Sequence, residues 1–172
     1  MGLKNKYKRA EKIISNTDGE DYRIIKAICR EIQVTQQQLV MKAADNFTRC
    51  LNGCHGLCCK NIMLDDIISL NDFILIQTLQ PGMKPEIERC LEDEKIMFTA
   101  DCIFLKNQTG PCLFPDDLKP CTCVTTFCDD TVPARKEIGA VKMKFLKLDW
   151  FIRWIWLKQA GGFLLNMINI RG

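Results

Sequence analysis

The sequence predicts a mainly α-helical, small and irregular domain, with a cysteine-rich metal-binding core and one short β-hairpin. Apolar residues recur at helical spacing on both sides of a cysteine-rich middle segment. That segment, from Cys50 to Cys128, holds nine of the eleven cysteines of the chain. With 172 residues and 47% hydrophobic content, the chain is long enough to bury a sizeable core. We therefore expect residues 1–172 to form a single domain.

Two elements are expected before the cysteines. The first is a basic N-terminal segment over residues 1–15, either a short helix or a loose arm, whose first twelve positions hold five basic and one acidic side chain. From about Glu20 to Phe47, apolar residues recur every three or four positions, which predicts one long helix. The polar run 35–38 is expected to weaken it. Cys29 lies near its apolar face and is interpreted as core filling.

Two further helices are expected after the first cysteine group. The dense apolar residues of Leu64–Leu79 predict a buried helix that starts at Asp65 or Asp66 and ends before Pro81-Gly82. A third helix should carry Pro85 in its first turn and extend to about Met97. Cys90 lies on this charged helix, and we interpret it as structural.

The next segment changes character and predicts a hairpin. The apolar arms Cys102–Leu105 and Cys112–Phe114 flank a polar stretch that ends in Gly110-Pro111. Such a hairpin would bring Cys102 and Cys112 close together. The prolines that follow should keep residues 115–134 irregular, and metal ligation would order a segment with so little apolar content.

Residues 135–172 are expected to form an apolar and basic C-terminal helix that ends at Gly161-Gly162. The segment holds all three tryptophans, Trp150, Trp154 and Trp156, among lysines and arginines. Its charges are too frequent for a normal membrane span. It is either a last core helix or a docking surface for a partner or a membrane face. We expect a larger protein complex to dock here, with Trp154 and Trp156 partly exposed.

The thiols themselves allow three chemistries: disulfides, inert burial or metal binding. The start of the chain is charged and has no apolar signal sequence, which argues against an oxidising compartment and predicts a cytoplasmic protein. Cys58 and Cys59 are adjacent, and a disulfide between neighbours is strained. Nine clustered positions are too many for inert thiols alone. Metal binding is therefore the favoured interpretation.

Thiolates select zinc, Cu(I) and iron–sulfur clusters. A single zinc takes four ligands and would leave five thiols without a role, whereas nine would supply two four-thiolate clusters with one to spare. We expect one or two iron–sulfur clusters, of the 4Fe-4S type, with Zn²⁺ as the alternative. Whether His55, the only histidine, is a ligand stays open. The candidate ligands are Cys50, Cys54, Cys58, Cys59, Cys102, Cys112, Cys121, Cys123 and Cys128.

The pattern resembles a known family. CLNGCHGLCC at Cys50–Cys59, then CIFL at Cys102–Leu105, CLF at Cys112–Phe114 and a cysteine nine residues on, is similar to the YkgJ-type cysteine-cluster proteins. The resemblance implies a zinc- or iron-chelating domain over roughly residues 50–128. Both gaps in the first group are one residue longer than in that family, and Asp117 and Leu118 stand where the family has Arg-Pro.

The charge distribution and the motif content limit the classes of function that the sequence favours. The net charge is +3, with an acidic middle between basic ends, which argues against a nucleic-acid-binding stripe. The sequence contains no phosphate loop, Ser/His/Asp set or dinucleotide fingerprint, so whether the chain is an enzyme stays open. Lysine methylases with a similar cysteine cluster are a third option, without a cofactor-binding segment here to support it. We expect electron transfer or an accessory role in activating a larger metalloenzyme; the alternative is a zinc-stapled interaction module without redox role.

Overall fold

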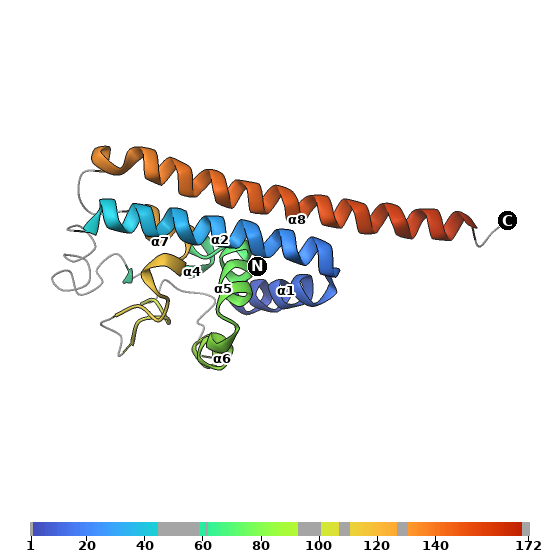
Figure 1. The fold of residues 1–172 in the computed structure, drawn as a ribbon. Coiled ribbons are helices and arrows are strands. Elements are labelled where there is room, and N and C mark those ends of the chain that lie inside the picture. The colour runs from blue at the N-terminus through green and yellow to red at the C-terminus, as the bar shows by residue number, and fades with distance from the viewer. Residues whose placement is uncertain are drawn as a thin grey trace.

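A computed structural model describes residues 2–44, 59–60, 62–92, 101–106, 111–126 and 131–169, the last with side chains to residue 160. The fold is mainly helical, as predicted. Two long helices form its frame, α2 (Gly19–Lys42) and α8 (Arg135–Asn169), which pack side by side and run antiparallel (Figure 1). Ion pairs between the two helices follow this antiparallel order. Glu31, in the middle of α2, pairs with Lys144 and Lys147, and Asp21, near the start of α2, pairs with Lys158.

The core-facing side of α8 explains why this segment is a helix. Its buried apolar residues alternate at spacings of three and four, which places them on one stripe of an α-helix. The helix does not end at Gly161-Gly162, as the sequence suggested, but continues to Asn169. A helical glycine costs only about 1 kcal/mol relative to alanine, so two glycines do not oblige a helix to stop. The stripe consists of Ile138, Val141, Phe145, Leu148, Ile152 and Ile155.

The basic N-terminal segment forms the helix α1 (Leu3–Asn16), which is the first of the two predicted alternatives. Leu3, Tyr7, Ala10 and Ile13 are buried, and their spacings of four, three and three place them on one face of the helix. This face packs on α5 (Leu70–Leu79), where the ring of Tyr7 meets that of Phe73 edge-on at 5.4 Å. The basic residues therefore belong to a helix that is anchored by its apolar side.

The single helix predicted over residues 64–79 is two helices, α4 (Leu64–Ile67) and α5. Ser69 interrupts it by forming a capping box with Asp72 at the start of α5. Lys6 of α1 donates to the carbonyl oxygens of Asp65 and Ile68, which satisfies the end of α4. The dense apolar residues of this segment predicted one long helix, but the hydrogen bonds of Ser69 and Lys6 divide it into two.

Short elements complete the chain. As predicted, α5 ends before Pro81, and a helix with Pro85 in its first turn follows: η2 (Pro81–Met83) leads into α6 (Lys84–Glu92). Farther on lie η4 (Asp116–Leu118), α7 (Cys121–Thr125) and η5 (Val132–Ala134), which precedes α8. In the part of the chain that the structure describes, no helix has an apolar stretch of the length and purity needed to cross a bilayer.

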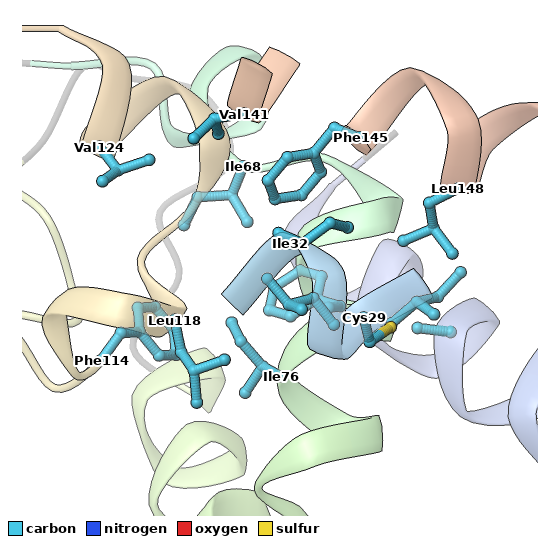
Figure 2. Packing of buried hydrophobic residues seen from close by; sticks show 14 of the residues in the cluster. Cys29, Ile32, Ile68, Ile76, Phe114, Leu118, Val124, Val141, Phe145 and Leu148 are labelled. Carbon is cyan, nitrogen blue, oxygen red and sulfur yellow. The ribbon is translucent and has the colours of Figure 1, made fainter. Parts of the chain in front are cut away.

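The core forms where α2, α5 and α8 meet residues 111–126. Figure 2 shows Ile32 of α2, Phe145 and Leu148 of α8, and Leu118 of η4 around a common centre. Every one of these side chains is at most 7% exposed. The cysteine-bearing segment is therefore not an appendage: its own apolar residues are part of the core that holds the helices together.

Candidate metal centre

The structure describes five of the nine predicted ligands: Cys59, Cys102, Cys112, Cys121 and Cys123. All five are partly buried, and no disulfide joins them to another described cysteine. The other four, Cys50, Cys54, Cys58 and Cys128, lie outside the described residues, as does His55. Within the described ranges, no three Cys, His, Asp or Glu side chains form a group that could hold a metal ion.

A backbone hydrogen bond joins the two cysteine groups. The N–H of Cys102 donates to the carbonyl oxygen of Cys59 over 2.7 Å. These two residues are far apart in the sequence, so the bond fixes the end of the first group against the start of the second. Two of the predicted ligands are thereby brought to one place, a juxtaposition that the sequence pattern alone could not establish.

The predicted hairpin is present only as local pairing. Leu105 and Cys112 form an isolated antiparallel bridge, and no described residue between 101 and 114 belongs to a strand. Two backbone bonds support the bridge, from Lys106 N–H to the Pro111 oxygen at 3.0 Å and from Leu113 N–H to the Phe104 oxygen at 2.7 Å. The pairing is too short for a ladder, but it sets the arm that carries Cys102 beside the arm that carries Cys112.

Two buried aromatic side chains pack beneath these arms. Phe104 and Phe114 are buried, and their rings pack at 4.8 Å with a tilt of 45°. Both rings face the core rather than solvent, so the arms that carry Cys102 and Cys112 have one apolar side. Phe114 also packs near Leu118, so this aromatic pair is continuous with the main core (Figure 2).

Burial raises the pKa of the Cys112 thiol. Three groups act in the opposite direction: the backbone N–H of Phe114, which faces the sulfur, and the cations Lys119 and Lys106. Asp116 adds to the raising effect. An N–H group aimed at a cysteine sulfur is what a thiolate ligand uses for stabilisation once a metal has replaced its proton.

Cys121 is anchored to the core by its backbone. Its N–H donates to Oδ1 of Asp72 over 2.7 Å, and Asp72 is only 1% exposed. Burial and the nearby Asp72 carboxylate raise the pKa of the Cys121 thiol to about 12, against a lowering effect from Lys142 of α8. Cys123 lies two residues on, in the same short helix α7, and is also partly buried.

Glutamines of α2 fix the segment that leads to Cys121. Gln33 and Gln37 both donate to Oδ2 of Asp117, at 3.0 and 2.8 Å. Gln36, which is fully buried, donates to the carbonyl oxygen of Lys119 at 2.8 Å. Contrary to the expectation from the sequence, the polar run 35–38 leaves α2 unbroken, and Gln36 and Gln37 hold the neighbouring segment. The signal was present, since a glutamine in the middle of an apolar stripe needs a buried partner.

The two cysteines assigned a structural role lie elsewhere. Cys29 of α2 is fully buried in the core, as predicted, where burial raises the pKa of its thiol to about 12 beside the hydroxyl of Thr78. Cys90 of α6 is partly buried and packs against the core, in agreement with the structural interpretation.

The described arrangement thus sets soft sulfur donors from three chain segments at the end of the fold where α8 begins (Figure 1). The segments are held by backbone pairing, by a buried carboxylate and by glutamines. Comparison with known proteins adds no further assignment: no family model matches the chain, and no curated protein or solved structure matches it.

Proposed function

We propose that this chain is a cysteine-ligated metalloprotein with an iron–sulfur centre, acting in electron transfer or as an accessory factor that activates a larger metalloenzyme. The observation that carries the proposal is the hydrogen bond between Cys102 and Cys59, which joins two cysteine groups that are separate in the sequence. The resemblance to the YkgJ-type family points to the same chemistry.

The donor set fits an iron–sulfur centre. Cys59, Cys102, Cys112, Cys121 and Cys123 would supply thiolates from the described segments, together with cysteines outside them. The centre, when bound, would accept and release single electrons. This chain's own residues would tune it: the N–H of Phe114 faces the sulfur of Cys112, while Phe104 and Phe114 keep water from one side.

The alternative is a zinc-stapled module for protein interaction, without a redox role. It is favoured by the shortness of the elements at this end of the fold, since α7 has five residues and η4 three. Segments of this kind gain order from a structural metal. In both cases free thiols are required, which supports a reducing compartment such as the cytoplasm.

A protein partner is the second part of the proposal. We expect a larger complex to contact residues 135–172 near their start, where α8 passes α7 and hence Cys121 and Cys123. An open groove of about 520 Å³ lies there between the end of α2 and the first turns of α8, lined in part by Met41, Lys136 and Ala140. Met41 is 78% exposed, which makes it a suitable anchor.

Serine substitutions test the metal centre. Replacement of Cys59, Cys102, Cys112 or Cys121 should each lower the bound metal per chain after anaerobic purification. Cys90→Ser is the matched control, because Cys90 is also a partly buried cysteine but lies on α6. Equal metal content in all variants, including Cys90→Ser, would contradict the proposal.

A further inference from the structure

The outer side of α8 carries a second apolar stripe. Met143, Leu146, Trp150, Trp154 and Leu157 follow one another at spacings of three or four residues. At 100° per residue they fall within an arc of about 80°, opposite the stripe that packs into the core. Their exposed fractions are 63%, 52%, 71%, 43% and 73%, so the stripe faces solvent over its whole length. We call these five residues the outer ridge.

The outer ridge is long, and at least one of its tryptophans is held in place. From Met143 to Leu157 it extends about 21 Å along the helix axis. Trp154 stacks on Phe151 at 5.5 Å, and the Nζ atom of Lys158 lies 5.3 Å from the Trp154 ring centre. Trp156 belongs to another face, because it lies under the guanidinium of Arg9 at 4.1 Å. A contiguous exposed apolar surface of this kind marks an interaction site.

Cations outnumber acids around the outer ridge. Residues 135–158 hold seven basic and two acidic side chains. At 100° per residue, Glu137 falls on the far side of α8 and Asp149 about 60° beyond the ridge, whereas the exposed cations lie on the ridge or within about 40° of its edges. Three of those cations bond to acids: Lys147 to Glu31, Lys158 to Asp21 and Arg153 to Asp149. The exposed cations on the ridge side are Arg135, Lys136, Lys142, Lys147, Arg153 and Lys158.

This charge distribution decides between occupants. A second copy packed antiparallel through the same ridge would place basic flanks against basic flanks, which opposes self-association. In Figure 1, α8 borders the fold on one side, and no other described helix covers its outer side. Tryptophan and leucine on such an edge, with lysine and arginine on both sides, are the residues of a helix that lies in a membrane interface.

We propose that the outer ridge of α8 docks this chain onto an anionic lipid surface. The helix would lie along the membrane plane, with its five apolar side chains at the boundary between headgroups and acyl chains and its cations among the phosphates. The groove near Met41 and the cysteine-bearing segments lie at the end of α8 and would stay accessible to a protein partner. The inference does not depend on which metal the chain holds.

Vesicle binding of the full chain tests this directly. Phosphatidylcholine vesicles with about 30 mol% phosphatidylserine should sediment the protein and shift its tryptophan emission to the blue, whereas pure phosphatidylcholine should bind it at least about tenfold more weakly. Raised salt should reduce the binding. Equal binding to both kinds of vesicle, or binding to neither, would overturn the proposal.

Two variants place the contact on the outer ridge. Trp150→Gln/Leu157→Gln changes its two most exposed residues and should weaken vesicle binding about tenfold, which corresponds to 1.4 kcal/mol. Val34→Gln, at an exposed apolar position on α2, is the control and should bind as the parent does. Arg135→Glu/Lys136→Glu should lower the preference for anionic lipid without removing an apolar contact.

Circular dichroism and metal content should be the same in all of these variants, because none of the substituted residues is buried. If the ridge variant binds vesicles as well as the parent, the proposal is wrong and another part of the chain makes the contact. Analytical ultracentrifugation without lipid provides a separate check. A dimer that the ridge substitutions abolish would overturn the proposal in favour of a second copy as the occupant.

Discussion

The N–H of Cys121 donates to Oδ1 of the buried Asp72 over 2.7 Å. Asp72 also accepts from the backbone N–H and hydroxyl of Ser69, so its second oxygen caps α5 while the first holds α7. One carboxylate thus joins a core helix to a predicted metal ligand. Burial raises the pKa of Asp72. The hydrogen bonds from Ser69 and Cys121 act in the opposite direction and offset the free-energy cost of burying the carboxylate.

Asp72→Asn should therefore affect both the core and the candidate metal centre. An asparagine keeps the shape but loses the charge-assisted bonds, and its NH₂ group cannot accept both Ser69 donors. We expect a loss of about 1–3 kcal/mol in the free energy of unfolding, measured by urea denaturation. Asp66→Asn, at an exposed position on α4, is the control and should be near neutral. Equal stability of both variants would show that the hydrogen bonds of Asp72 contribute little to the free energy of unfolding.

Metal removal should loosen one end of the fold selectively. Residues 111–126 have short elements and are held by Asp72 and by the glutamines of α2, whereas α2 itself packs along α8. Hydrogen exchange should thus rise within Pro111–Pro133 after chelation, while residues 25–39 of α2 keep their protection. Equal exchange in the metal-loaded and metal-free chain, over both regions, would contradict a structural role for the metal.

Asp18 links stability to acid pH. The backbone N–H of Asp21 holds the pKa of the Asp18 carboxyl below its ordinary value, with a further contribution from Lys158 at 3.7 Å. Because the folded chain has the lower pKa, this stabilisation is complete above the unfolded value of about 3.9 and is lost as the pH falls through the folded value. Asp18→Asn keeps a capping side chain but removes the charge.

The parent should therefore exceed Asp18→Asn in its urea midpoint at neutral pH, and the difference should shrink in acid. Glu20→Gln, which removes a carboxylate from the exposed pair with Arg23, provides the control for a general charge effect. A difference that stays constant from neutral to acid pH would show that the charge of Asp18 contributes nothing.

Cys29 should stay unreactive toward thiol reagents in the folded chain. Burial raises the pKa of its thiol from 9.0 to about 12, and its side chain is fully buried. Iodoacetamide should consequently leave Cys29 unmodified in the folded chain and react with it only after denaturation, as peptide mass spectrometry would show. Because the folded pKa is the higher one, stability from this thiol is complete below the unfolded pKa and is lost as the pH rises toward about 12.

Periodicity predicted the long helices well, because each has an apolar stripe that repeats over many turns. It failed where a hydrogen bond decides the outcome. Leu64–Leu79 is apolar enough for one helix, yet Ser69 and Asp72 form a capping box and divide it. The box was visible as a serine followed three residues later by an acidic residue. At Gly161-Gly162 the opposite error occurred, since glycine weakens a helix without ending it.

The candidate site was predictable only as a set of residue types. Cysteine spacing indicated which thiols to consider, but not that Cys59 and Cys102 share a backbone hydrogen bond. Nor could it identify Gln36 as the partner of Lys119, because such contacts depend on the packing of distant segments. For the tail, composition indicated exposed tryptophans, and Trp154 and Trp156 are partly exposed as expected. The composition did not indicate that Trp150 is more exposed than Trp154 or Trp156.

The most direct test of the metal proposal is anaerobic purification of the full chain followed by analysis of iron, acid-labile sulfide and zinc. The iron–sulfur proposal predicts a brown protein that contains iron and sulfide in similar amounts, absorbs broadly near about 400 nm and bleaches with dithionite. Colourless protein that carries stoichiometric zinc, and that takes up no iron on reconstitution, would contradict it and leave the zinc-stapled module as the better account.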